Sequence, residues 1–241
     1  AGLILLGGCA ADLPRGATSV LELFREPSPS EAAAWALDKY DADKRERGLR
    51  LLGTATFVGD ELYLRLYRDR LTDPAPGVRL SAVRALANHG TPDDVPLILA
   101  RLEDEDAQVR REAARGLQRL SNPVAIDPLL RLTSEEREAE PEVRAEAAEA
   151  LGQYAESRVV EGLVAALDDR NLAVNHAALR SLRTLTGQDF GYDRRAWVPW
   201  LSSEQRLFAA RSQYVYPVFQ RAKAWYEYIP LFPPPPNEAA A

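Results

Sequence analysis

The chain of 241 residues contains no methionine, one cysteine and two histidines. A single cysteine excludes a disulfide within the chain, and no pair of Cys or His residues has the spacing of a zinc site. The sequence has neither a Gly-rich phosphate loop nor a Ser-His-Asp set. We therefore expect no catalytic residues, no cofactor and no bound metal. Because the initiator methionine is missing, we expect a fragment or a processed form.

Positive charge is also scarce relative to negative charge. The formal net charge is -6, and the sequence pI is about 5.2. A general nucleic-acid binder needs a basic surface to displace counterions, so we expect no nucleic-acid partner, although one small basic patch is still compatible with this composition. Hydrophobic residues make up 46% of the chain, which is ordinary for a soluble folded protein.

The chain begins with a short apolar run, in residues 3–6. At four residues it is far shorter than the roughly 20 needed to cross a bilayer. It is followed by Gly7, Gly8 and Cys9, a pattern that resembles the end of a secretory signal and the bacterial lipobox. That resemblance predicts lipid attachment at Cys9 and a location in the bacterial cell envelope, anchored to a membrane and facing the periplasm. The alternative is a buried apolar segment with an inert thiol.

One pattern occurs five times along the chain. It consists of an anchor residue, Arg at +1, a small residue at +4, an apolar residue at +5 and Leu at +8. The anchors are 34, 31, 34 and 31 residues apart. The copies are Lys44-Arg45-Gly48-Leu49-Leu52, Val78-Arg79-Ala82-Val83-Leu86, Val109-Arg110-Ala113-Ala114-Leu117, Val143-Arg144-Ala147-Ala148-Leu151 and Val174-Asn175-Ala178-Leu179-Leu182.

The spacing within each copy is that of one α-helical face. A recurrence of about 30 residues indicates stacked repeats instead of one globular core. The sequence therefore predicts an all-α fold, an α-solenoid of about five helix pairs with an aromatic-rich C-terminal cap. We expect helix pairs at about 75–102, 106–132, 141–167 and 170–186, with no sheet. The small residue at +4 would let neighbouring helices approach closely.

An aspartate lies five residues before the anchor in three of the five copies. The residues at these repeat positions are Arg45, Arg79, Arg110, Arg144, Asp73, Asp104 and Asp169. We interpret them as structural: the arginines would pair with turn carboxylates or carbonyls of the adjacent repeat, and the acids would cap the following helix. The alternative is that the arginines bind an anion.

The repeated Asp, Val-Arg, Ala and Leu positions resemble HEAT-like repeats of the short phycobilin-lyase type, over residues 41–187. Two copies depart from the pattern, with Lys44 as the first anchor and Asn175 in place of the fifth arginine, as expected of end repeats. The whole layout also resembles a group of bacterial HEAT-repeat lipoproteins, which implies a compartment but no activity.

The sequence divides into five segments. These are the end of a signal peptide and lipobox (1–9), a tether (10–30), the repeats (31–187), the C-terminal cap (188–232) and a Pro-rich disordered tail (233–241). Ser30 is the expected N-cap of the first helix.

Aromatic residues are concentrated after residue 187. They include Trp197, Trp200 and Trp225. We expect these rings to cover the last repeat, while some of them could contact a partner, because Trp and Tyr dominate binding hot spots. Asp189-Phe190-Gly191 copies a kinase triplet, but the other kinase motifs are absent. We interpret it as the turn into the cap.

These observations favour a protein-binding or scaffolding module that is tethered to a membrane by its N-terminal lipid and is not an enzyme. We expect the second helix of each pair to line the curved binding face. One alternative follows from the family resemblance, namely a bilin-lyase-like enzyme or an enzyme accessory subunit. Another is a purely structural component of the envelope.

Overall fold

The computed structural model describes residues 27–54, 60–203 and 206–216, and these residues form helices and loops without any strand. The helices are α1 (Pro29–Ala36), α2 (Ala42–Thr54), α3 (Glu61–Arg70), α4 (Pro76–His89), α5 (Val95–Leu99), α6 (Ala107–Gly116), α7 (Ile126–Leu132), α8 (Pro141–Leu151), α9 (Ser157–Ala166), α10 (Leu172–Thr186) and α11 (Arg194–Ser203), with short 3-10 helices η2 (Pro92–Asp94), η3 (Ala100–Glu103) and η4 (Pro123–Ala125).

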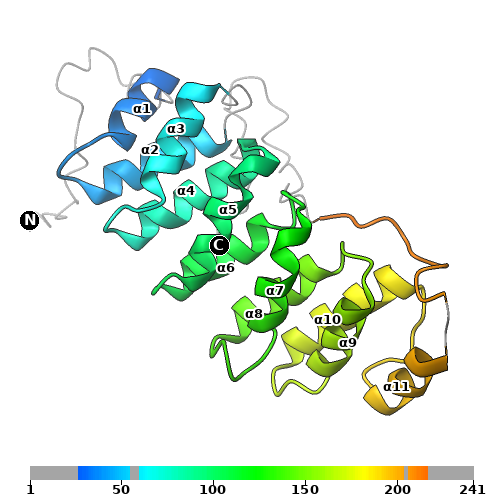
Figure 1. Cartoon of the computed structure of the whole chain (residues 1–241). Coiled ribbons are helices and arrows are strands. Elements are labelled where there is room, and N and C mark those ends of the chain that lie inside the picture. The colour runs from blue at the N-terminus through cyan, green and yellow to red at the C-terminus, as the bar shows by residue number, and fades with distance from the viewer. Residues whose placement is uncertain (1–26, 55–59, 204–205, 217–241) are drawn as a thin grey trace, which may run out of the picture.

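The five copies of the sequence pattern lie on five helices, α2, α4, α6, α8 and α10, which we call the motif helices. Each is followed by a second helix that packs against the stack, namely α3, the η2–α5–η3 unit, the η4–α7 unit, α9 and α11. The units follow one another from α1 at one end to α11 at the other (Figure 1). The predicted α-solenoid is confirmed, and so are the helix pairs predicted at 75–102, 106–132 and 141–167. The range 170–186 holds the single helix α10 and not a pair, because its second helix, α11, begins only at Arg194.

The core is formed by the repeated positions. The anchors of the second to fifth copies and the residues at +4, +5 and +8 of all five copies are buried. Small residues at +4 have the expected consequence: a Cβ added to Gly48 would meet the carbonyl oxygen of Ala32 in α1. Leu117 and Leu151, at +8, have no exposed surface.

Two of the second helices are divided into short 3-10 and α-helical pieces, a detail that the sequence pattern did not predict. Proline explains it. Pro96 has no N–H to donate to the carbonyl of Pro92 four residues earlier, so η2 ends and α5 begins there. In the third repeat Pro123 begins η4, and Pro128 has no N–H to donate to the carbonyl of Val124, so η4 and α7 are divided in the same way. In the fourth repeat α9 contains no proline and is one continuous helix.

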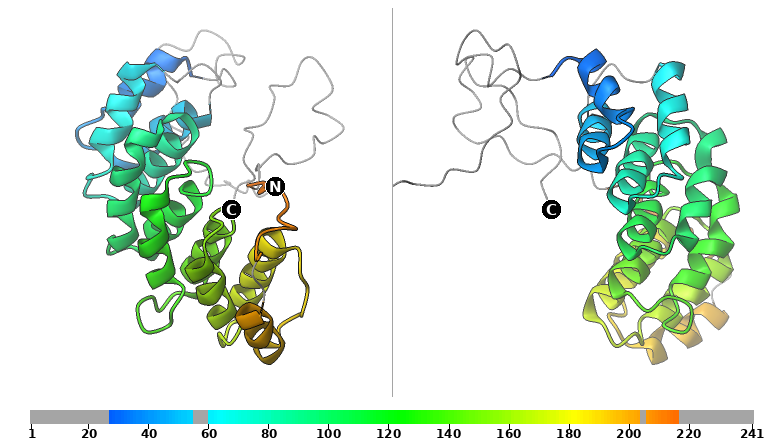
Figure 2. Two further views of the ribbon diagram at one scale, coloured as in Figure 1. Left: turned by 45° about the vertical axis from the view of Figure 1, so that its right-hand side comes forward. Right: turned by 90° about the vertical axis from the view of Figure 1, so that its left-hand side faces the viewer.

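The helices form two layers, and the motif helices are the inner one. Successive motif helices pack directly against one another along the stack, whereas successive second helices make few contacts. In a curved stack the layer with the closer spacing lies on the hollow side. The right-hand view of Figure 2 shows both layers bowed, with the motif helices on that side. The expectation that the second helices line the curved face is therefore wrong.

The first helix begins slightly earlier than predicted. Ser28, not Ser30, is the N-cap of α1, because its hydroxyl accepts from Glu31 N at 3.3 Å while the Glu31 carboxylate accepts from Ser28 N at 2.7 Å. This reciprocal pair is a capping box. Pro29 then occupies the first helical position, where its missing N–H costs nothing.

The chain turns sharply into the C-terminal cap. α10 ends at Gly187, which has φ 68° and therefore needs glycine. Asp189-Phe190-Gly191 lies in the following turn, as predicted. Trp197 of α11 is fully buried, and its ring packs edge-on against Phe190 and Trp200 at centroid distances of 4.9 and 5.9 Å.

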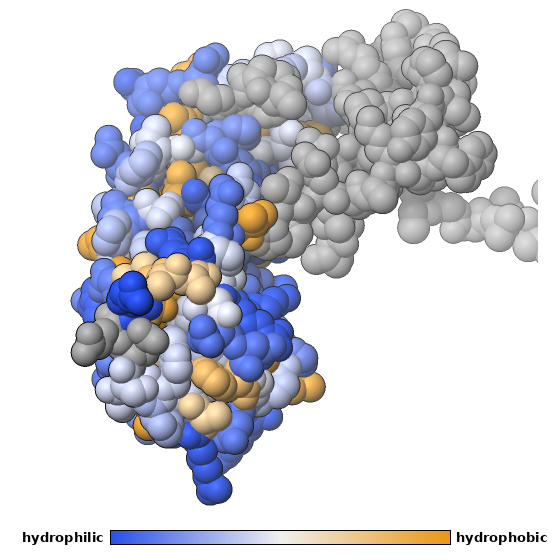
Figure 3. All heavy atoms as spheres, turned by 90° about the vertical axis from the view of Figure 1, so that its right-hand side faces the viewer, coloured by the Kyte–Doolittle hydropathy of each residue, from blue (hydrophilic) through white to orange (hydrophobic). Residues whose placement is uncertain are grey.

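From the α11 end, the surface is mostly hydrophilic, with hydrophobic areas that are small and separate (Figure 3). A terminal unit with a polar outer face is what a repeat stack needs in order to end in water. Across the described residues, no helix combines the length and apolarity that a membrane span requires. Cys9, Trp225 and the predicted tail 233–241 lie outside the described residues, as does nearly all of the predicted tether.

Candidate binding surface

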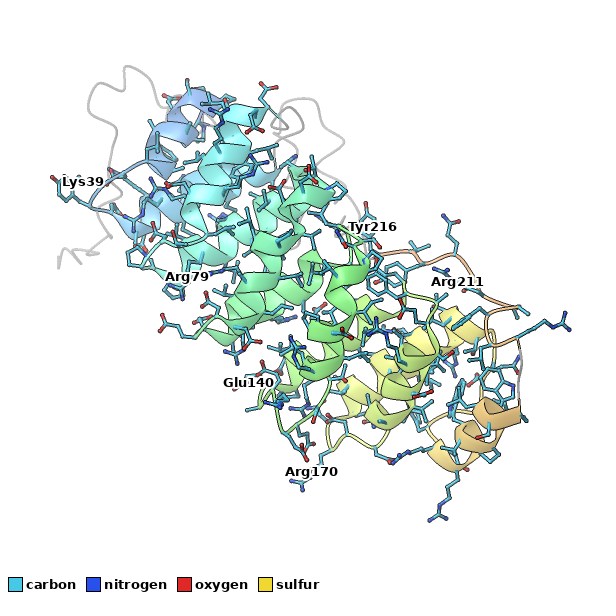
Figure 4. All side chains as sticks on the ribbon, viewed as in Figure 1. Lys39, Arg79, Glu140, Arg170, Arg211 and Tyr216 are labelled. Carbon is cyan, nitrogen blue, oxygen red and sulfur yellow. The ribbon has the colours of Figure 1, made fainter. Side chains whose placement is uncertain are left out.

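The repeat arginines link neighbouring units along one edge of the solenoid. Each guanidinium forms two hydrogen bonds to a carboxylate that lies five residues before the next anchor. The pairs are Arg45–Asp73, Arg79–Asp104, Arg110–Glu138 and Arg144–Asp169, all at 2.7–3.0 Å. We call these eight residues the arginine–carboxylate ladder. Figure 4 shows Arg79, Glu140 and Arg170 on this edge, opposite Arg211 and Tyr216.

The same guanidinium groups also bind the turn before their own helix. For example, Arg79 Nη1 donates to the carbonyls of Asp73 and Pro74 at 3.0 and 3.2 Å. Arg110 and Arg144 make the equivalent contacts. In the fifth copy, Asn175 replaces the arginine and its side-chain amide donates to the carbonyl of Leu167. The interpretation of the arginines as structural links fits this geometry.

The carboxylates of the ladder do not cap helices directly. Each accepts a hydrogen bond from the backbone N–H two residues later, such as Ala75 N to Asp73 Oδ1 at 3.0 Å. The N-cap is that later residue, Ala75 in this case. The expectation of direct capping is therefore corrected to a turn-stabilising contact. Glu138 fills the same position in the fourth copy and accepts from Glu140 N. The sequence prediction included only aspartates at this position and therefore did not contain Glu138.

The environment of the ladder keeps three of its carboxylates, Asp73, Asp104 and Glu138, ionised. Burial by itself would raise the pKa of Asp73, Asp104 and Glu138. The guanidinium groups of Arg45, Arg79 and Arg110 and the neighbouring backbone N–H groups outweigh it and hold each pKa below its usual value.

This depression of the pKa makes stability depend on pH. In the unfolded chain these three carboxylates take up protons near pH 4. In the folded protein they are still ionised at that pH. The stabilisation is therefore fully present above about pH 4 and is lost as pH falls through the folded pKa values. Urea unfolding at a series of pH values should show this fall, and Glu138→Gln should be less stable at pH 7 and should lose less stability on acidification. An equally steep fall in Glu138→Gln would contradict this assignment.

The inner face of the solenoid carries rows of charged residues. We define the inner face as the side of the motif helices that points away from the second helices. It is formed by the residues 2, 3, 6 and 10 positions after each anchor. Its +6 row has a charged residue in every copy: Arg50, Arg84, Arg115, Glu149 and Arg180. Arg50 and Arg180 are exposed and the other three are half-buried. The sequence pattern was defined by +1, +4, +5 and +8 and did not include this row, which the structure places on the hollow side.

Ion pairs connect these rows between neighbouring motif helices. Arg84 donates twice to Glu112, both at 2.9 Å, and Arg180 pairs with Glu149. Gln118 donates to Glu146 at 2.8 Å. The side chains of Glu146 and Glu149 are 18% and 22% exposed, so this part of the face is partly shielded from water. This burial raises the pKa of both carboxyl groups.

The shielding comes partly from an extended segment, residues 211–216, which we call the strap. It runs back along the C-terminal ends of α10, α8 and α6. Ser212 N donates to Thr184 O at 2.9 Å, and Tyr214 Oη lies 3.2 Å from both Glu149 O and Gln118 Oε1. The strap ends with the Tyr216 ring 5.7 Å from the Arg119 guanidinium.

The predicted aromatic contact residues have different surroundings. Trp197 has no exposed surface and its indole N–H donates to Gly191 O at 2.9 Å, so no part of its ring can reach a partner. Trp200 is half-buried against it. The two histidines also make structural contacts: His89 Nε2 lies 2.9 Å from Gly53 O, and His176 Nδ1 lies 2.8 Å from Tyr192 Oη. Over the described ranges, no cluster of metal-ligating side chains occurs.

The comparison with protein families identifies the repeats. The sequence profile of HEAT repeats matches residues 64–140 and 136–193, more than half of the chain. The chain therefore belongs to the HEAT-repeat proteins. No curated protein sequence is significantly similar to it.

Solved structures share the fold at low sequence identity. The X-ray structure of Escherichia coli YibA has a TM-score of 0.55 and 22% identity, with 70% of this chain and 62% of that chain covered. An engineered protein has a TM-score of 0.52 and 21% identity, with 65% and 78% covered. The complex of CpcE and CpcF of phycocyanin lyase from Nostoc has 19% identity with 72% and 80% covered, but its TM-score of 0.32 supports no argument.

Proposed function

We propose that this chain is a protein-binding or scaffolding module that acts through the inner face of its solenoid, by binding and not by catalysis. HEAT-repeat solenoids present long continuous surfaces that suit macromolecular partners. The observation that carries the proposal is the strap. Its backbone and tyrosine side chains bind along the C-terminal ends of three motif helices, so this surface already accepts one extended polypeptide.

The inner face offers further binding groups beyond the strap. Its +6 row continues through α4 and α2 with Arg84 and Arg50. Charged rows of this kind select partners by electrostatic complementarity and increase the association rate. The same rows are held in place by ion pairs such as Arg84–Glu112, which lowers the entropic cost of ordering these side chains on binding.

We further propose that the module is tethered to a bacterial envelope membrane, facing the periplasm, through lipid on Cys9. The support is the sequence Leu6-Gly7-Gly8-Cys9. One acyl chain binds a membrane only marginally, so a stable anchor needs at least two. Mass spectrometry of protein from the native host should show the acyl mass on Cys9. An unmodified thiol within an intact N-terminus would remove the tether from the proposal.

The binding proposal is tested by capturing partners from detergent-solubilised membranes of the native host. Arg50→Glu combined with Arg180→Glu reverses two exposed charges of the inner face and should reduce the captured partner at least tenfold. The control, Arg131→Glu with Arg195→Glu, reverses two exposed charges elsewhere and should capture as the wild type does. Equal capture by both variants would contradict the inner face as the binding surface. Visible absorbance after incubation with a bilin, with no protein partner, would favour the bilin-lyase alternative.

A further inference from the structure

The inner face is divided into two regions of opposite charge. In the first three copies, its positions carry six arginines and two glutamates, which are Arg47, Arg50, Arg84, Arg111, Arg115, Arg119, Glu46 and Glu112. In the last two copies they carry one arginine and two glutamates, which are Arg180, Glu146 and Glu149. A chain with a net charge of -6 therefore concentrates positive charge on the inner side of α2, α4 and α6.

Several arginines of this basic region are ordered by their neighbours. Arg84 is held by two hydrogen bonds to Glu112. The Arg47 guanidinium lies 5.0 Å from the centre of the Trp35 ring. Arg115 is half-buried, and burial lowers its pKa, so it is partly desolvated. Preformed and partly desolvated cations bind an anion more strongly than flexible surface cations do.

The spacing of the row limits the shape of a partner. Arg50, Arg84 and Arg115 occupy the same position in three consecutive motif helices. Packed helices lie about 8–10 Å apart. A polyproline II segment has three residues per turn and rises about 3.1 Å per residue, so its residues i, i+3 and i+6 share one face at intervals of roughly 9 Å. One side chain in three would therefore meet one arginine per repeat.

We propose that the basic region binds an acidic segment in polyproline II conformation, with a carboxylate at every third residue opposite Arg50, Arg84 and Arg115. This inference rests on the proposed protein-binding function and specifies the class of partner. The acidic segment lies next to the strap, whose Tyr216 ring is 5.7 Å from the Arg119 guanidinium on the same face. A nucleic acid fits less well, because Glu46 and Glu112 interrupt the positive charge and the phosphate backbone is uniformly negative.

The test uses fluorescence anisotropy of the full chain at low ionic strength, where ion pairs are least screened. The probes are two fluorescein-labelled peptides of identical composition, one with Glu-Pro-Pro repeated three times before a final Glu, the other with its four Glu residues together before six Pro. The regularly spaced peptide should bind about tenfold more tightly or better, a difference of about 1.4 kcal/mol. Equal affinity would overturn the proposed register.

Variants locate the site of peptide binding. Arg50→Gln with Arg84→Gln and Arg115→Gln should weaken binding of the spaced peptide at least tenfold. The control Arg131→Gln with Arg137→Gln and Arg195→Gln, which removes the same charge from exposed positions, should bind as the wild type does. Arg50→Gln alone is the variant to use if the triple variant folds poorly. Arg50 is exposed and has no ion-pair partner among the described residues, so this change should leave the fold intact and weaken peptide binding severalfold. Unchanged binding by Arg50→Gln and by a folded triple variant would overturn the proposal.

Two further outcomes separate this inference from the proposed function. Tighter binding of a single-stranded DNA oligonucleotide or of anionic lipid vesicles than of the spaced peptide would overturn it in favour of another polyanion. If the Arg-to-Gln triple variant still captures the membrane partner as well as the wild type, the acidic-segment inference fails while protein binding stands. If the wild-type chain captures no protein partner at all, the proposed function itself fails.

Discussion

Replacing Arg79 with leucine should lower the free energy of unfolding by about 3–5 kcal/mol. The substitution keeps an apolar side chain in place but removes all five donors of the guanidinium. Asp104 would then be a buried carboxylate without its two guanidinium hydrogen bonds, with Arg101 Nη1 at 3.6 Å as its remaining cation, and the carbonyls of Asp73 and Pro74 would lose their donor. Urea unfolding followed by circular dichroism measures the loss.

Two controls make the Arg79 result specific to the ladder. Adding Asp104→Asn to Arg79→Leu should recover part of the stability, because no uncompensated charge is then buried. Arg158→Leu removes an arginine whose pairs with Asp127 and Glu156 are exposed, and should cost less than about 1 kcal/mol. A loss below about 1 kcal/mol for Arg79→Leu would mean that the ladder does not hold the repeats together.

Replacing Trp197 with alanine should cost about 3–5 kcal/mol, as for other fully buried aromatic side chains. The indole is the largest fully buried side chain of the described residues, and it fixes Phe190 and Trp200 as well as the turn at Gly191. Stability in a repeat stack is close to a sum over neighbouring units. The loss should therefore appear first as faster amide hydrogen exchange in α11 and the end of α10.

Trp200→Ala removes a half-buried ring and should cost less than Trp197→Ala. The pair also distinguishes a core role from a contact role. If Trp197→Ala left stability and hydrogen exchange unchanged while partner capture was lost, the ring would be a contact residue, contrary to its burial. Trp197→Phe, which keeps an aromatic ring but loses the hydrogen bond to Gly191 O, should fall between alanine and the wild type.

Much of this fold follows from local sequence spacing. The +4, +5 and +8 positions share one helical face, so the motif helices could be located to within a few residues. The ladder was predictable for a similar reason, since Arg79 at +1 and Asp104 before the next anchor recur together. The pieces that sequence spacing did not predict depend on proline geometry, as at Pro96, or on a chemically equivalent residue, as at Glu138.

The side on which the stack is hollow was predicted wrongly, and the reason is instructive. Periodicity shows which side of a helix is buried, but curvature depends on the relative spacing of two layers. Small residues on the motif helices contain that information: a Cβ added to Gly53 of α2 would meet Ala85 of α4, and one added to Gly116 of α6 would meet Ala87 of α4. A layer rich in such residues is the one to place on the inner side of a curved solenoid.

The strap could not be predicted at all. Extended segments have no helical period, and residues 211–216 gain their positions from single contacts with distant residues. Tyr214 reaches Gln118, which is 96 residues earlier in the chain. The aromatic content of this region was visible in the sequence, but only tertiary structure separates Trp197, which is buried in the cap, from Tyr216, which lies over Arg119.

Site-directed photo-crosslinking in the native host tests most directly whether partners bind the inner face. A photoreactive amino acid replaces Arg50 or Arg180 on the inner face, or Arg131 or Glu161 on the second helices α7 and α9, all of them exposed positions. We predict a discrete protein adduct from the two inner-face positions and none from the two positions on the second helices. Adducts from Arg131 and Glu161 alone, or no adduct from Arg50 and Arg180, would contradict this account.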